Sequence, residues 1–403
     1  MFVWETLAAV PGNMRPAQGT EMKSSTPIRP KDIARFRLRR HHLLDEPPAD
    51  AVTLCRDVCG VQAQVMSAAY LQLWARNHAI SKAEITHALW QTRSLVKTSL
   101  MRQTLHLIPA DEFALYIAAL RPSRVAQALR AMARCGVDRE EGEALTPLIM
   151  DALSQAPLGR AAIAAAVRPK VSKRVRLFME NSWSMIRIPI AEGQICYGAG
   201  EGNEVVFVRT DRWLPNASRP KNKMSVTEAQ CALFRKYLRA YGPATPADFS
   251  HWAGIPMQEA KALGPLLESE LVDVFVDQKR CLLLREDLDE LHKDAKGKVC
   301  IRLLPNFDTY LLAHHDKEHL LSKENYKRVY RNQGWISAVV LVDGEIAGVW
   351  SYKPKGKKLA VEVEPFGKLS KVTRTGIERE AGSLAAFFER ELELKIVEGR
   401  PRL

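Results

Sequence analysis

Apolar residues recur at helical spacing in the third quarter of the chain, and two strand-like runs follow them. The pattern predicts a helix over 226–241, a short helix that Thr245 caps, and a third helix from about 256 to 268. Residues 271–286 then read as two strands around a polar turn at 277–280, which predicts a β-hairpin. Three helices followed by a hairpin are typical of a winged helix, a variant of the helix-turn-helix.

The same order of elements can be read twice more upstream. Residues 138–210 contain two helical patterns, a longer helical run at SKRVRLFMENSWSMIRI, and two strand-like runs around a glycine-rich turn. Residues 46–110 contain three helical patterns, the last capped by Ser81, before two strands in LVKTSLMRQTLHLIP. We therefore predict three tandem winged-helix units.

The last quarter of the chain has a different pattern. Alternation over 334–366 predicts a three-stranded meander with a tight Asp343-Gly344 turn, and the run 377–392 predicts a helix that closes the chain. The predicted fold class is α+β and mostly helical. The expected parts are a flexible arm (1–29), winged helix 1 (30–135), winged helix 2 (136–222), winged helix 3 (223–299) and a C-terminal β-meander with a helix (300–403).

Composition and charge narrow the class of partner. The 403 residues include 59 Lys+Arg against 46 Asp+Glu, a formal net charge of +13, which favours a polyanion such as nucleic acid. A membrane ranks last, because no apolar run approaches the ~18 residues that a span needs. The seven cysteines show no CxxC pair and the start lacks a signal-peptide pattern, so we expect a cytoplasmic, nucleoid-associated protein with free thiols.

Two glutamines, Gln62 and Gln64, flank one alanine at a junction between helical patterns. Gly60 just before them predicts that residues 60–65 are a short extended connector. Side chains two apart on an extended chain share one face, so both amides would point to one place, while Val61, Ala63 and Val65 would turn inward. Two amides can hold a water in a fixed orientation. On spacing alone, glutamines that satisfy backbone groups at a helix junction are the commoner case.

A family resemblance favours a catalytic role for the two glutamines over a purely structural one. VQAQ with LWAR, then MRQTLHLIPADEF, and later LLPNFDTYLL with VLVDGEIAGVW, resemble the AlkZ/YcaQ family of winged-helix DNA glycosylases from about residue 30 to the C-terminus. The resemblance implies that Gln62-Ala63-Gln64 is the catalytic element of a monofunctional glycosylase. It also implies removal of bulky alkylated purines, and some members unhook DNA interstrand crosslinks. The sequence AHH at 313–315 departs from the arginine-rich continuation of crosslink-active relatives.

The implied chemistry suits neutral side chains. Alkylation of the major-groove ring nitrogen of guanine makes the base a cation and a good leaving group, so little acid assistance is needed. Amides can orient the attacking water and stabilise the oxocarbenium-like sugar. We expect no cofactor and no metal, because His315 and His319 have no evident third ligand. The expected partner is duplex DNA carrying alkylated purines, bound by a monomer; a non-catalytic winged-helix regulator is the competing hypothesis.

Several basic or polar residues are candidates for DNA contact. Strand alternation places Arg102, Thr104 and His106 on one face, which either lines the DNA cleft or is simply half solvated. Asp308 either caps the helix that follows it or faces the lesion. The other candidates lie at the start of a predicted recognition helix and at a hairpin tip that could also be an ordinary solvated turn: Lys173, Arg174, Lys353, Lys355, Lys357 and Lys358.

Overall fold

The computed structural model describes residues 28–44, 49–181, 183–200, 205–214, 224–292 and 297–397. Most of the expected arm, 1–29, and the tip of the glycine-rich turn, 201–204, lie outside these ranges. No helix in the described ranges is both long enough and apolar enough to cross a membrane.

The amino-terminal segment runs from short helices through a hairpin into one long helix, α5. Ser81 caps α4 with a capping box, as predicted. Helix α5 was not predicted, because Pro122 lies inside its apolar pattern. The elements are α1 (Pro30–Arg40), α2 (Ala51–Asp57), β1 (Val61–Gln62), α3 (Met66–Trp74), α4 (Lys82–Trp90), β2 (Leu95–Ser99), η1 (Met101–Gln103), β3 (Leu105–Pro109), η2 (Ala110–Glu112) and α5 (Phe113–Arg134).

The second segment departs from the prediction at its longest helical run. Instead of one helix, the chain forms α8, a 3-10 turn and α9. Pro189 lacks a backbone N–H and is tolerated in the first turn of a helix, so a new helix begins at Arg187. The elements are α6 (Arg139–Ala152), β4 (Leu158–Gly159), α7 (Arg160–Val167), η3 (Arg168–Lys170), α8 (Lys173–Asn181), η4 (Trp183–Ile186), α9 (Arg187–Ala191), β5 (Ile195–Gly198), β6 (Val206–Arg209) and α10 (Thr210–Trp213).

The hairpins of the first two segments form one continuous sheet. Its strand order is β1-β3-β2-β5-β6-β4, and β2 joins β5 through the pair Lys97 and Tyr197. The pattern of alternation predicted each hairpin but not this pairing, which joins residues a hundred positions apart in sequence. The sheet places β1, which carries Gln62, at its edge.

The third segment follows the predicted order of three helices and a hairpin. Ser225 caps α11 with a capping box, and Thr245 caps α12 as expected. The hairpin turn is shorter than predicted, since only Asp277 and Gln278, both with positive φ, separate the strands. The elements are α11 (Val226–Tyr241), α12 (Pro246–Ala253), α13 (Met257–Leu266), η6 (Glu268–Glu270), β7 (Leu271–Val276), β8 (Lys279–Leu284), η7 (Arg285–Asp287) and α14 (Leu288–Leu291).

The predicted meander is the centre of a five-stranded sheet of order β13-β12-β11-β10-β9. Asp343 and Gly344 form its tight turn with positive φ, as expected. The prediction that a helix closes the chain is wrong, because α17 ends at Phe387 and β13 then pairs parallel to β12. The elements are β9 (Ile301–Leu304), α15 (Thr309–Leu312), η8 (Lys323–Asn325), α16 (Tyr326–Val329), η9 (Asn332–Gly334), β10 (Val339–Val342), β11 (Glu345–Lys355), β12 (Lys358–Pro365), α17 (Lys371–Phe387) and β13 (Glu391–Ile396).

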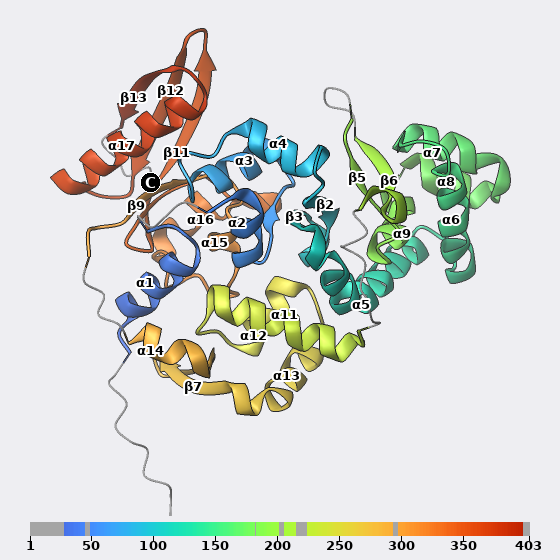
Figure 1. The fold of residues 1–403 in the computed structure, drawn as a ribbon, viewed down its shortest axis with the longest axis horizontal. Coiled ribbons are helices and arrows are strands. Elements are labelled where there is room, and N and C mark those ends of the chain that lie inside the picture. The colour runs from blue at the N-terminus through green and yellow to red at the C-terminus, as the bar shows by residue number, and fades with distance from the viewer. Residues whose placement is uncertain are drawn as a thin grey trace, which may run out of the picture.

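Two of the hydrophobic cores join different segments, whereas a third lies within the second segment and the end of α5. Leu54 of α2 packs in one cluster with Val340 of β10, so the first and last segments are joined. Tyr116 of α5 packs in a second cluster with Phe234 of α11. In Figure 1, α6, α7 and α8 lie on one side of the molecule and α17 with β11–β13 on the other, with α2, α3 and α4 between them.

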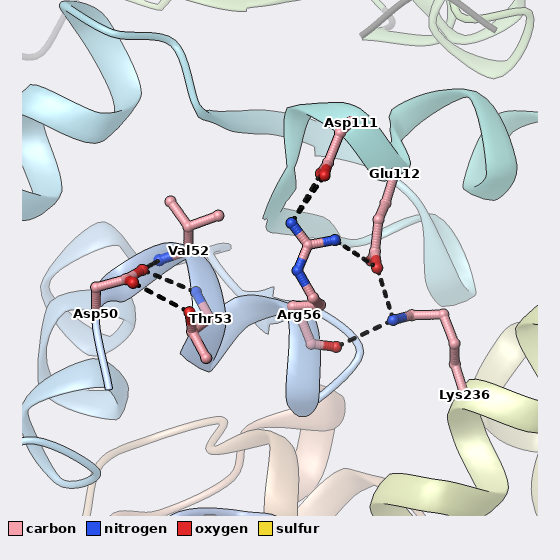
Figure 2. Close-up of polar contacts among 7 residues, drawn as sticks. All are labelled: Asp50, Val52, Thr53, Arg56, Asp111, Glu112 and Lys236. Atoms are coloured by element: carbon pink, nitrogen blue, oxygen red, sulfur yellow. Dashed lines mark hydrogen bonds and ion pairs between the residues drawn. The ribbon is translucent and has the colours of Figure 1, made fainter. Parts of the chain in front are cut away.

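Arg56 ties the end of α2 to two other elements (Figure 2). Its guanidinium donates to Glu112 at 3.0 Å and to Asp111 at 2.9 Å, both in η2. Lys236 of α11 contacts the same Glu112 carboxylate at 2.8 Å and the Arg56 carbonyl at 3.3 Å. Because α2 leads into β1, this network fixes the chain shortly before Gln62.

Replacing Glu112 by Ala should lower the free energy of unfolding by about 1 kcal/mol, because Arg56 and Lys236 lose the carboxylate they share and are themselves partly solvated. Asp111→Ala is the matched control, since its side chain is 56% exposed against 13% for Glu112. Urea unfolding of both variants measures the difference. A larger loss for Asp111→Ala would contradict this role of Glu112.

Candidate active site at the glutamine pair

The connector that carries the glutamines is extended, as predicted. Gly60 has φ +92, and a Cβ there would lie 2.9 Å from the Ile108 side chain, so only glycine turns the chain from α2 into β1 without strain. Gln62 pairs with His106 of β3, and the Ala63 N–H donates to the Leu105 carbonyl at 2.7 Å. The connector is thereby fixed against the β2–β3 hairpin.

The two glutamines differ in exposure. Val61 and Ala63 are buried, as predicted, but Gln62 is only 5% exposed, whereas Gln64 is exposed. Val65 is 36% exposed, so the prediction that it turns inward is wrong. The reason is that Val65 is the N-cap of α3, where the chain leaves the extended conformation and its alternation ends.

Each carboxamide oxygen accepts one hydrogen bond from the protein. Gln62 Oε1 accepts from Arg102 Nη2 at 3.4 Å, and Gln64 Oε1 accepts from the Leu105 N–H at 3.3 Å. A carbonyl oxygen has two lone pairs, so each can also accept from a water. The side chains are therefore partly oriented before any substrate binds.

Arg102 does not lie on a strand face. It belongs to η1 in the hairpin loop, where Arg102 and Gln103 have φ 52 and 62, and this turn breaks the expected alternation. Its guanidinium donates to the Trp252 carbonyl at 2.7 Å as well as to Gln62. Burial lowers its pKa to about 10, so it stays charged at neutral pH. Arg102 positions Gln62 and anchors the loop to α12.

His106 is on β3 but is only 2% exposed, so the predicted exposed polar face is wrong for it. Its Nδ1 lies 3.0 Å from the Thr104 carbonyl, which only accepts, so Nδ1 carries the proton and Nε2 is an acceptor. Burial, and then the charge of Arg102, lower the pKa of His106 to about 3, which keeps it neutral. Thr104 is half-buried and donates to the Met101 carbonyl at 3.1 Å.

Asp308 is wholly buried. It caps α15 by accepting from the Tyr310 N–H at 2.9 Å, and it pairs with Arg76 through two hydrogen bonds of 2.9 Å each. Both side chains of this ion pair are 0% exposed. These contacts confirm the interpretation that Asp308 caps the helix that follows it.

Gln72 of α3 connects this ion pair to the connector. Arg76 donates to the Gln72 carbonyl at 2.8 Å, and the Gln72 amide nitrogen donates to the Gln62 carbonyl at 2.8 Å. The Gln72 amide oxygen accepts from the Thr309 N–H at 3.2 Å. Through Gln72, the loop that contains Asp308 therefore helps to fix the backbone of Gln62. Arg76 is the arginine of LWAR, a stretch that resembles the family, but no local pattern predicted its contact with Asp308.

Gln64 opens onto a cleft of about 310 Å³ between the β2–β3 hairpin and α9. Arg124 of α5 is buried in this cleft, and no sequence pattern indicated it, since α5 was not predicted. Gln62 does not line the cleft, but it lies two residues away on the same connector. The lining residues are Gln64, Ser99, Gln103, Leu105, Arg124, Ile186, Arg187, Ile190, Ala191, Tyr197 and Val205.

The remaining basic candidates lie on other elements. Arg174, at the start of α8, is half exposed and pairs with Asp138 and Glu141, while Lys173 beside it is exposed. The four lysines of the β11–β12 hairpin are exposed near its tip, and Lys355 lies 3.8 Å from Glu393: Lys353, Lys355, Lys357 and Lys358. Among the described residues, no group of three His, Cys, Asp or Glu side chains is arranged to hold a metal.

Comparison with known proteins assigns the family. A family model described as DNA glycosylase AlkZ-like matches residues 55–387. The interstrand DNA cross-link repair glycosylase of Streptomyces sahachiroi is 29% identical over 366 residues, which are 88% of this chain and 95% of that protein. The solved structure of Streptomyces sahachiroi DNA glycosylase AlkZ matches with a TM-score of 0.80 and 28% identity, over 91% of this chain and 99% of that one.

A match over this much of the chain, with a shared α+β fold, defines the protein as a DNA glycosylase. The chain belongs to the AlkZ-like DNA glycosylase family. The resemblance that the sequence motifs indicated is thereby confirmed.

Asp308→Ala should lower the free energy of unfolding by about 4 kcal/mol, because it leaves the buried Arg76 guanidinium without its partner. Asp50→Ala is the control, since Asp50 is also a helix N-cap but is exposed, and its loss should cost only about 1 kcal/mol. Chemical unfolding measures both. Equal losses would show that Asp308 acts as a cap alone.

Lowering the pH should destabilise the protein through His106. The unfolded side chain binds a proton below about 6.5, but the folded one does so only near 3, so stability is lost as the pH falls through this window. Between pH 7.5 and 5.0 His106 alone should contribute a loss of about 2 kcal/mol. Urea unfolding of wild type and His106→Gln at both pH values measures it. An unchanged pH dependence in the variant would refute the buried, neutral state.

Proposed function

We propose that the protein hydrolyses the N-glycosidic bond of bulky alkylated purines in duplex DNA, as a monomer, with Gln62 and Gln64 positioning the attacking water. The observation that carries this proposal is the fixed, extended connector that holds Gln64 at the mouth of the cleft with Gln62 two residues away. Membership of the AlkZ-like DNA glycosylase family supports it.

The site suits a substrate whose base is already a cation. His106, the titratable group opposite Gln62, is held neutral by burial, and its low pKa makes it a poor proton donor at neutral pH. An alkylated purine needs little protonation to leave, so oriented amides are sufficient. Their oxygens carry partial negative charge that stabilises the oxocarbenium-like sugar and accepts a hydrogen bond from the water. No lysine nucleophile is needed, which is the basis for proposing a monofunctional enzyme.

DNA binding is proposed to use three tandem winged-helix units and the basic hairpin of β11 and β12. The order of three helices and a hairpin at 226–284 supports the third unit. The sheet that the first two segments share supports a fixed position of the first unit relative to the second. The exposed lysines near the tip, Lys353, Lys357 and Lys358, fit phosphate contact. In Figure 1 this hairpin projects from the body of the protein beside α17.

Crosslinked duplex is the more specific substrate proposed. It is supported by the Streptomyces sahachiroi relative, which is named as an interstrand DNA cross-link repair glycosylase. Gln64 lines the cleft and is exposed, and an exposed site can admit a base that is tethered to the opposite strand. Monoadducts and crosslinks can be compared directly by incubating the protein with each duplex.

Replacing both glutamines, Gln62→Ala with Gln64→Ala, should abolish release of the alkylated base and keep the affinity for duplex DNA. Each single variant should slow release by about a hundredfold, the usual cost of losing one positioned polar group in a transition state. Single-turnover assays with one site-specific alkylated purine measure the rate, and Gln258→Ala, an exposed glutamine of α13, is the control. Full activity of the double variant would refute the assignment. Binding without base release by the wild type would indicate a non-catalytic winged-helix regulator.

A further inference from the structure

Arg124 has an unusual environment for a guanidinium. The residue lies on α5, is 6% exposed, and lines the cleft beside Gln64. Its Nε and Nη1 are buried without a hydrogen-bond partner, and no ion pair to it occurs within the described part of the chain. A buried guanidinium without a carboxylate is costly, and native proteins rarely retain one that nothing pairs with. This pattern points to a ligand that supplies the partner.

The cleft around Arg124 favours an anion. Its described lining residues include a second guanidinium, Arg187, and contain no Asp or Glu. Burial lowers the pKa of Arg124 only to about 10, so the side chain is charged at neutral pH. Burial also raises the pKa of Tyr197 to about 12, so this residue stays a neutral hydroxyl donor. The cleft therefore presents donors and positive charge to whatever enters it.

The apolar part of the lining strengthens this attraction. Leu105, Ile190 and Val205 form walls of low polarity, and charges interact more strongly where water is excluded. Guanidinium groups bind phosphate oxygens with two parallel hydrogen bonds, which a lysine cannot reproduce. In duplex DNA the anion next to any sugar is a backbone phosphate.

We propose that this cleft is a phosphodiester-binding site, in which Arg124, together with Arg187, holds a backbone phosphate adjoining the damaged nucleotide. This proposal rests on the proposed function, because it assigns the sugar of that nucleotide to Gln64. Arg124 and Gln64 line the same cleft of about 310 Å³, so one nucleotide can reach both. Phosphate capture then sets the distance between the anomeric carbon and the glutamine pair, and binding energy from the backbone is used for orientation.

The test replaces single phosphates near the lesion by neutral methylphosphonates. Each duplex carries one alkylated purine and one methylphosphonate, and single-turnover base release is measured for wild type and Arg124→Met. In the wild type, one position should slow release by tenfold or more. In Arg124→Met, release is already slow, and the same methylphosphonate should change it by less than twofold. If its effect is as large as in wild type, Arg124 does not contact that phosphate, and the proposal is overturned.

Two further variants keep the result interpretable. Arg124→Lys retains the charge but not the two parallel hydrogen bonds, so it should keep only part of the penalty at the sensitive position. Arg139→Met removes an exposed arginine that pairs with Glu143 on α6, and it should behave as wild type. Arg124→Met should also melt no lower than wild type, because it removes an unpaired buried charge. Arg124 would have a structural role instead if Arg124→Met lowered the melting temperature, Arg124→Lys restored it, and no methylphosphonate position changed the rate of base release.

Binding gives a readout that does not depend on base release. The affinity for duplex with a stable abasic analogue falls as the salt concentration rises. In a plot of log affinity against log salt concentration, the slope of Arg124→Met should be shallower than that of wild type by about 0.9. If the wild type releases no base but this slope difference is found, the catalytic proposal fails and the phosphate site stands. If base release is normal and Arg124→Met matches wild type in rate and slope, the phosphate site alone is refuted.

Discussion

The buried ion pair between Arg76 and Asp308 joins parts of the chain that are 232 residues apart. Two charges that are wholly removed from water must satisfy each other, since breaking such a pair leaves an uncompensated charge in the interior. The pair therefore fixes the position of α3 relative to the loop before α15. Through Gln72, the same contacts reach the Gln62 carbonyl. The geometry of the glutamine connector therefore depends on this structural charge pair as well as on Gly60 and the pairing with β3.

The polar groups around the connector divide into two kinds. Arg102 and Arg124 are charged and close enough to lower the pKa of His106, so the neighbourhood is positive and attracts a polyanion. Positive charge alone would disfavour a cationic sugar. In the proposed function, the carboxamide oxygens of Gln62 and Gln64 oppose that effect locally, because each presents the negative end of its dipole to the sugar. A site that binds phosphate and stabilises an oxocarbenium needs both kinds of group.

Local signals predicted the helices well where caps and periodicity agreed. Helices α11 and α12 match their predicted ranges closely, because Gly242-Pro243 ends the apolar pattern of α11 and Thr245 with Pro246 marks the start of α12. Strands β9 and β13, which complete the C-terminal sheet, were missed, and so was the pairing of the predicted strands β2 and β5. The exposure of His106 could not be read from alternation, since the turn at Arg102 is set by tertiary contacts with Trp252. Arg124 had no sequence signal, because α5, the helix that carries it, was not predicted.

The most direct measurement is a crystal structure of the protein with duplex DNA containing a cationic pyrrolidine analogue of the oxocarbenium sugar. The pyrrolidine nitrogen and one ordered water should lie within hydrogen-bonding distance of the Gln62 and Gln64 carboxamides, with the connector unchanged. DNA bound with this sugar out of reach of both carboxamides would contradict the catalytic assignment.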